Sequence, residues 1–102
     1  MVDDCIFCKI IAGDIPSSKV YEDEEVLAFL DISQVTPGHT LVVPKKHARN
    51  LLEMDETATA QLFARVSKVA KKVEAATQAK GMNIISNMEE VSGQTVFHTH
   101  VH

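Results

Sequence analysis

The segment from about Asp55 to Lys80 constrains the fold more than any other part of this sequence. Its apolar side chains recur at helical spacing and share one face: Leu62, Val66, Val69 and Val73, with Phe63 and Ala70 beside them. Acidic residues at its start, Lys80 at its end and a following Gly81 that can take the left-handed cap predict where this long helix begins and ends. One helix cannot bury such a face alone, so the remaining chain must supply a partner layer.

The remaining sequence is divided by glycines and prolines into pieces too short for stable helices, and several are rich in β-branched residues. Before the long helix they predict a short helix over Cys5–Ala12 closed by Gly13, a hairpin of Lys19–Glu22 and Val26–Asp31, and a strand over His39–Pro44. After it they predict a strand over Met82–Ser86, a loop over Asn87–Gln94 and a last strand over Thr95–His102. The order predicts an α+β fold in which an antiparallel sheet is covered by one long helix.

The composition limits the number of domains and the kinds of partner. With 102 residues, of which 45% are hydrophobic, the chain can form one core, so residues 1–102 are interpreted as a single domain. A net charge of −4 argues against nucleic acid as a partner, because phosphate backbones require a basic face. The opening MVDDCIFCKIIAG has an acidic pair where a signal peptide needs positive charge, and Lys9 interrupts its apolar run. We therefore predict a cytoplasmic protein without a membrane partner.

Three of the five histidines stand at every second position of the apolar segment VFHTHVH, as His98, His100 and His102. On a strand, residues two apart face the same side at about 6.6 Å, so these imidazoles form a row with its outer members about 13 Å apart. They cannot all bind one small atom unless the strand bends. The central His100 is therefore the natural member to touch a reacting centre.

Several interpretations of this row remain open. It can be an interrupted purification tag, a solvated strand face, a metal site of the H-x-H type, or a nucleophilic imidazole that attacks phosphorus while its neighbours protonate the leaving group. The preceding Ser92-Gly93-Gln94-Thr95 offers backbone N–H groups, an amide and hydroxyls, which suit a phosphate. This loop favours the nucleophile over the metal site.

Three segments, CIFCKIIAGDIPS, AFLDISQVTPGHTLVVPKKH and GQTVFHTHVH, occur here in this order. Through them the whole chain resembles the histidine triad (HIT) family of nucleotide-binding proteins, in particular its short bacterial members with a CxxC. The resemblance implies an α+β half-barrel that pairs into a homodimer. It also implies hydrolysis or transfer of purine nucleoside monophosphates, with phosphoramidates as the expected substrates. Cleavage of dinucleoside polyphosphates, or a zinc-stabilised nucleotide-binding module without significant catalysis, are the alternatives.

The resemblance also implies roles for individual residues. His100 is the expected nucleophile on the α-phosphorus, held by the carbonyl of His98, while His102 binds the phosphate and assists the leaving group and His39 supports the nucleophile. The expected phosphate-binding residues are Asn87, Gly93, Gln94 and Thr95, and Asp31 is expected to bind the ribose hydroxyls. The expected walls of the base pocket are Ile6, Phe7, Ile10, Phe29 and Ile32. From sequence alone, core packing is the stronger interpretation of each apolar residue.

The two cysteines, Cys5 and Cys8, have the spacing that lets both thiolates reach one tetrahedral zinc, but they supply only half of such a site. A redox pair and two inert thiols are alternatives, although the βαβ pattern typical of a redox CxxC is missing. The resemblance implies a structural zinc held by Cys5, Cys8, His47 and His98, and no organic cofactor.

Members of the family continue past the third histidine, whereas here nothing follows His102. The resemblance therefore predicts a chain truncated just after the H-x-H-x-H motif. A terminal carboxylate on His102 would repel an anionic phosphate bound beside it. We accordingly expect the full-length form to be active and leave the activity of the 102 residues open.

Overall fold

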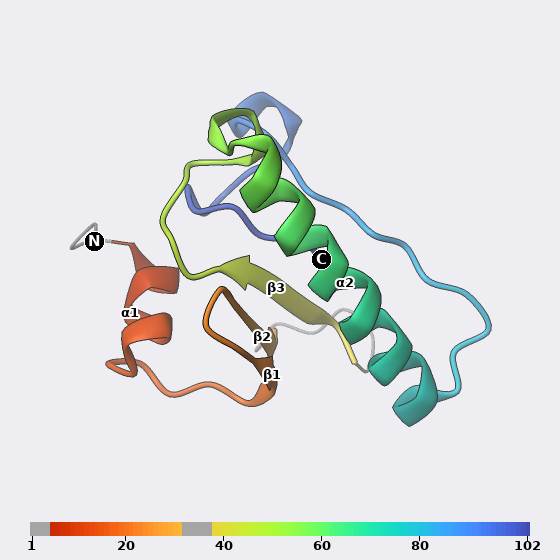
Figure 1. The fold of residues 1–102 in the computed structure, drawn as a ribbon. Helices are drawn as coiled ribbons and strands as arrows, with labels where there is room; N and C mark the ends of the chain where they lie inside the picture. The colour runs from red at the N-terminus through yellow and green to blue at the C-terminus, as the bar shows by residue number, and fades with distance from the viewer. Residues whose placement is uncertain (1–4, 32–37) are drawn as a thin grey trace.

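A computed structural model describes residues 5–31 and 38–102 (Figure 1). The elements in chain order are α1 (Ile6–Ala12), β1 (Lys19–Glu22), β2 (Val26–Leu30), β3 (Thr40–Pro44), the 3₁₀ turn η1 (Leu51–Glu53), α2 (Glu56–Thr77) and the 3₁₀ turn η2 (Glu90–Ser92). Within the described residues, the sheet has three antiparallel strands in the order β1-β2-β3. The predictions of an α+β fold, of one long helix and of a short N-terminal helix are confirmed.

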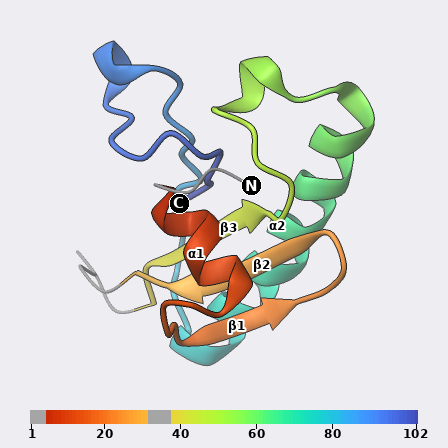
Figure 2. The same cartoon turned by 90° about the vertical axis from the view of Figure 1, so that its left-hand side faces the viewer.

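Both faces of the sheet are covered (Figure 2), which explains why β2 and β3 are almost continuous apolar runs. Alternate side chains of β2 and β3 sort into two clusters. Toward α1, Phe7, Cys8 and Ile10 pack against Leu27, Phe29, Leu41 and Val43. Toward α2, Leu62, Val66 and Val69 pack against Val26, Ala28 and Val42. The sheet is therefore the middle layer between the two helices.

The turn between β1 and β2 is fixed by the carboxylate of Asp23. One oxygen accepts hydrogen bonds from the backbone N–H groups of Glu25 and Val26, at 2.8 and 2.9 Å. The other accepts from the Tyr21 hydroxyl at 2.7 Å and from Arg65 Nε at 2.9 Å. Burial alone would raise the pKa of Asp23, but the hydrogen bonds from Tyr21, Arg65 and the backbone outweigh it and hold that pKa well below its usual range. The hairpin is thereby attached to α2.

The long helix ends earlier than its sequence pattern predicts. Asp55 is the N-cap, its carboxylate accepting from the Ala58 N–H at 2.7 Å, but the left-handed C-cap is Gln78 and not Gly81. The Gln78 N–H donates to the Glu74 carbonyl at 2.7 Å. Val73 is the last helix residue packed against the core, so the following residues bury nothing that would extend the helix.

The two strands predicted after the helix are not formed. Residues 82–86 contain no assigned strand, and their only backbone pairing with residues 95–102 in the described structure joins Ile85 to His102, at 2.8 and 3.3 Å. Residues 95–102 pair with the sheet only through the Val42–Val101 bridge. One pair of hydrogen bonds and side chains as exposed as Ile84 and Ile85, at 54% and 49%, do not sustain a strand.

The described residues contain no helix that is both long enough and apolar enough to cross a membrane. The predicted half-barrel and the homodimer remain predictions.

The contact between α2 and the sheet can be tested with Leu62, which is 1% exposed at the centre of that cluster. Leu62→Ala is expected to lower the free energy of unfolding by about 2–5 kcal/mol, because it leaves a cavity. The control, Leu52→Ala, removes the same atoms from a side chain that is 74% exposed and should change stability by no more than about 0.5 kcal/mol. Urea unfolding measures both, and equal effects would contradict this packing.

Candidate functional site

The segment carrying the three histidines is held against β3 by backbone hydrogen bonds. Val42 and Val101 exchange both of theirs at 2.9 Å, and Ala48 O accepts the Thr99 N–H at 2.8 Å and its hydroxyl at 3.0 Å. Val101 points into the cluster under α2. His98 and His100 therefore face the other side, where both rings pack edge-on against Phe7 with centroids 6.0 and 5.0 Å away.

The ring of His100 is fixed in plane and in tautomer. Its Nδ1 lies 2.8 Å from the backbone carbonyl oxygen of His98, and the side chain is 5% exposed. A carbonyl oxygen only accepts, so Nδ1 carries the proton and, in the neutral ring, Nε2 keeps its lone pair. This is the arrangement that the resemblance implies for a nucleophile.

A second group of polar side chains continues from His100 toward the surface. The ring centroids of His100 and His102 are 4.9 Å apart, and His102 Nδ1 lies 3.0 Å from His39 Nε2. His39 Nδ1 in turn lies 3.6 Å from Asp31 Oδ2. Burial, followed by the nearby His100 and His39, lowers the pKa of His102. Four of the predicted site residues are thus neighbours, although Asp31 and His39 lie 63 residues or more from His102 in sequence.

A groove of about 930 Å³ adjoins this group. His39, His102 and Asn87 contribute polar groups to its wall. The remaining wall is largely apolar and comes from α2, β3 and the segment after the helix, including Val66, Val69, Val73, Ile84 and Ile85. The His39–His102 pair can therefore be approached from this side of the molecule.

The four residues predicted to bind zinc are brought together. Cys5, the N-cap of α1, and Cys8 in its first turn lie beside His47, from the connection after β3, and His98. The Cys8 Sγ–His47 Nδ1 and Cys5 Sγ–His98 Nδ1 distances are 3.3 and 3.4 Å, and the two Nδ1 atoms are 3.0 Å apart. All four candidate ligand atoms lie within 4.8 Å of one another.

The two sulfur–nitrogen distances fit a tetrahedral metal ion, and the 3.0 Å between the two Nδ1 atoms is about 0.3 Å shorter than such an ion requires. Zinc bonds of about 2.3 Å to sulfur and about 2.0 Å to nitrogen place neighbouring ligand atoms about 3.3–3.8 Å apart. His98 Nε2 lies 2.8 Å from the Pro44 carbonyl oxygen, so that nitrogen carries the proton and leaves Nδ1 to the cluster. Burial lowers the pKa of His98 to about 4, which keeps the ring neutral, as a ligand must be. Burial raises the pKa of the Cys5 thiol, and a bound cation would reverse that effect.

The residues predicted to bind phosphate are arranged around one loop but differ in availability. Gly93 has φ 108° and is exposed, and a Cβ there would lie 3.6 Å from Asn87 Nδ2, so the Asn87 side chain lies beside this glycine. Thr95 is exposed. Gln94 is 2% exposed, and its amide already bonds Asn50, the Glu89 N–H and the carbonyls of Arg49 and Val96. The structure therefore places Gln94 in the loop's support and not at its surface.

The residues predicted to form the base pocket are mostly in the core. Phe7, Ile10 and Phe29 are at most 9% exposed and belong to the cluster between α1 and the sheet. Ile6 is 45% exposed and is free to contact a ligand. Ile32 lies outside the described residues. Core packing thus accounts for three of the five.

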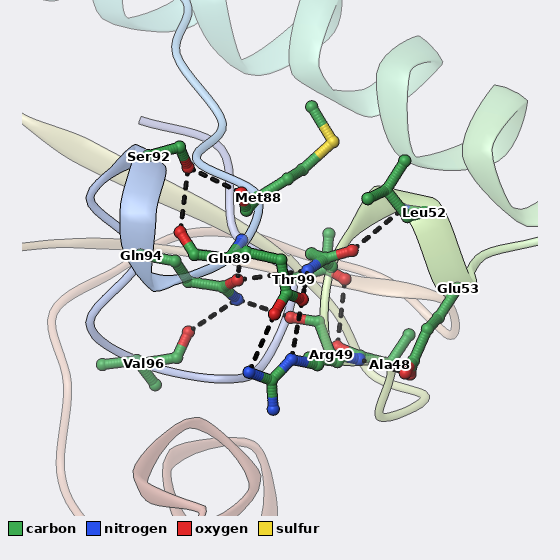
Figure 3. A network of polar contacts seen from close by, with 11 residues as sticks. Ala48, Arg49, Leu52, Glu53, Met88, Glu89, Ser92, Gln94, Val96 and Thr99 are labelled. Carbon is green, nitrogen blue, oxygen red and sulfur yellow. Dashed lines mark hydrogen bonds and ion pairs between the residues drawn. The ribbon is translucent and has the colours of Figure 1, made fainter.

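A polar network that was not predicted from the sequence joins Glu89 of this loop to Arg49 (Figure 3) and to Asn50. Arg49 binds both carboxylate oxygens of Glu89, at 2.8 and 3.0 Å, and Asn50 Nδ2 donates to the same group at 2.7 Å. Arg49 and Glu89 are 40 residues apart, and no local pattern joins them. Only the tertiary structure identifies this pair.

The HIT domain family matches residues 12–102 of this chain. "Protein hit" of Bacillus subtilis is 56% identical over 98% of this chain and 69% of its own length. A protein from Streptococcus mutans, solved by crystallography, superposes with a TM-score of 0.97 at 67% identity, over 99% of this chain and 64% of its own. A plant relative from Arabidopsis thaliana, "Adenylylsulfatase HINT3", is 37% identical over 98% of this chain and 51% of its own length.

The α+β layers and the clustered histidines therefore define a histidine triad domain. This chain belongs to the HIT domain family of nucleotide-binding proteins and is similar to its bacterial members. It spans a little under two thirds of the Streptococcus chain.

The tautomer of His100 can be measured directly. With ¹⁵N-labelled histidine, the long-range N–H correlations of His100 are expected to be those of a neutral Nδ1–H ring, because the His98 carbonyl accepts that proton. His100→Gln, which deletes one set of signals, provides the assignment. A ring protonated at Nε2 alone would contradict the geometry described here.

Proposed function

We propose that this chain is a nucleotidyl hydrolase or transferase that cleaves the P–N or P–O bond at the α-phosphate of a purine nucleoside 5′-monophosphate derivative. The reaction would pass through a nucleotidyl intermediate on His100. Nucleoside phosphoramidates are the favoured substrates, and dinucleoside polyphosphates are the alternative.

The observation that carries this proposal is the hydrogen bond between His100 Nδ1 and the His98 carbonyl. In the neutral ring it places the proton on Nδ1 and the lone pair on Nε2, and it holds the ring against Phe7, at a centroid distance of 5.0 Å. A weak nucleophile gains most from such fixed orientation, since little order has to be created during attack.

The Nε2 lone pair of His100 forms a bond to the α-phosphorus while the bond to the leaving group breaks. The anionic phosphate would favour the protonated form of His102, which gives its proton to the departing nitrogen or oxygen. Water then attacks the phosphorus, the N–P bond breaks, and His102 takes the proton of that water. The nucleoside monophosphate leaves and both imidazoles return to their starting states. His39, 3.0 Å from His102, would orient its ring.

Binding would use the groups nearest the histidines. Asn87, Thr95 and the backbone at Gly93 would line the phosphate, with Gln94 supporting the loop from inside, and Asp31 would accept hydrogen bonds from the ribose hydroxyls. Ile6 and the neighbouring side chains of α1 would contact the base. The protein would act in the cytoplasm as a homodimer.

The relative named "Adenylylsulfatase HINT3" supports hydrolysis at a nucleotidyl phosphorus by a domain of this family. Adenylyl sulfate carries an oxygen leaving group, so this relative favours including P–O bonds in the proposal. A nucleotide-binding module without significant catalysis is separated from the enzyme by one assay, because it would bind AMP but form no covalent intermediate.

We also propose that the cluster of Cys5, Cys8, His47 and His98 holds a structural zinc ion. The ion would attach α1 and the connection after β3 to the segment that carries His100. His98 would bind the zinc ion through its ring Nδ1, while its backbone carbonyl accepts the hydrogen bond from His100 Nδ1. The metal would therefore steady the nucleophile without touching the substrate.

The nucleophile is tested by intact-protein mass spectrometry after brief mixing with an adenosine phosphoramidate and quenching without acid. The native protein is expected to gain the mass of one adenylyl group. His100→Ala should gain none, bind AMP measurably, and lose turnover by at least about a thousandfold. Unchanged turnover in His100→Ala would sink the proposal.

The metal site is tested by zinc analysis together with thermal unfolding. The native protein is expected to contain one zinc per chain, and Cys8→Ser to contain none and to unfold at least about 10 °C lower, since metal binding and folding are coupled. Chelator should lower the Tm of the native protein and leave that of Cys8→Ser unchanged. A metal-free native protein with a Tm equal to that of Cys8→Ser would argue for two inert thiols.

A further inference from the structure

The loop of residues 87–94 contains a glutamate in a backbone conformation that is otherwise adopted almost only by glycine. Glu89 has φ 74° and ψ 157°, a region that side chains with a Cβ strongly disfavour. Residues remain in such conformations only when their surroundings impose them, and these residues concentrate at functional sites. The contacts that hold Glu89 therefore indicate what its loop has to do.

Glu89 is held by its side chain and by its backbone (Figure 3). Its carboxylate accepts hydrogen bonds from Nε and Nη2 of the Arg49 guanidinium and from the Asn50 side-chain amide. Its own N–H donates to Gln94 Oε1 at 2.8 Å, and its carbonyl accepts from the N–H groups of Ser92 and Gln94 at 3.1 and 3.2 Å. A two-point Arg–carboxylate contact fixes direction as well as distance.

Arg49 is itself fixed on three sides. Its guanidinium carbon lies 4.2 Å from the centroid of the Phe97 ring. Its backbone N–H donates to Glu53 Oε1 at 3.0 Å, and its backbone carbonyl accepts from Gln94 Nε2 at 2.6 Å. The partner of Glu89 is thus part of the segment that also carries His47, and it does not move freely like an ordinary surface arginine.

The loop held in this way lies next to the histidines. Ser86, just before it, donates its hydroxyl to the His100 carbonyl at 2.9 Å. Asn87 therefore stands between two anchors, Ser86 on His100 and Glu89 on Arg49, and its side chain lies beside Gly93. Asn87, Gly93 and Thr95 are the groups assigned to the phosphate above, and their relative positions depend on the turn that Glu89 makes.

We infer that Arg49 and Glu89 are positioning residues that hold the loop of residues 87–94, and Thr95 after it, in the shape that binds the α-phosphate. This inference rests on the proposed function. The pair touches neither the phosphate nor His100, and it acts by fixing the backbone between Asn87 and Gly93. Without it, Glu89 would relax to an ordinary conformation and move the phosphate-binding groups apart.

The test compares binding of AMP with binding of adenosine, which lacks the phosphate, by calorimetry well below the Tm. Glu89→Gln and the conservative Arg49→Lys are each expected to weaken AMP binding about tenfold and to leave adenosine binding unchanged. KM for a phosphoramidate should rise with them. The double variant should lose no more than either single one, because both remove the same contact.

The matched control is Arg65→Lys, the same substitution in the ion pair with Asp23, whose 2.9 Å contact lies away from the loop. It should lower the Tm and leave the ratio of AMP to adenosine affinity unchanged. If Glu89→Gln and Arg49→Lys behave like Arg65→Lys, the pair is structural only and the inference is overturned. If the native protein binds no AMP, the proposed function fails as well, so the two failures are distinguishable.

Discussion

The antiparallel bridge between Val42 and Val101 is the contact on which the arrangement of this site depends. It sets the register of the histidine segment against β3, and register decides which alternate side chains face α1 and which face α2. With Val101 buried under α2, His98 and His100 must face Phe7. A shift of one residue would put both imidazoles into the apolar cluster under the helix, separate His98 from the cysteines and destroy both groups together.

The fold was predictable where a segment's own pattern determines its structure. The periodicity of the long helix, the Asp23 turn and the β-branched run before Pro44 each report local preferences, and all three elements form. The end of the helix at Gln78 and the absence of strands after it were not predictable in this way. They depend on whether residues beyond Val73 find something to pack against, which no window of the sequence contains.

The functional site was likewise predictable only where a local sequence pattern indicates it. The alternation of His98, His100 and His102 was visible in the sequence, and the spacing of the cysteines indicated half of a metal site. That His47 completes the cluster was implied by the resemblance, and the geometry brings it there, whereas the contact between Asp31 and His39 came from the structure alone. Gln94 shows the limit of a motif, because its position was expected but its amide faces inward. Neither the sequence around Arg49 nor that around Glu89 predicted their pairing or the positive φ of Glu89.

His98 connects the two groups because it uses different atoms for each. Its ring faces the cysteines and His47 through Nδ1 and the Pro44 carbonyl through Nε2, while its backbone carbonyl accepts from His100. The ring is fully buried and its pKa is lowered to about 4, so no proton competes for Nδ1 at neutral pH. Any force that holds the ring of His98 in the cluster also fixes the carbonyl that sets the tautomer of His100. A metal ion at the cluster would thus influence the chemistry at His100 through one rigid residue, without an electronic role in the reaction.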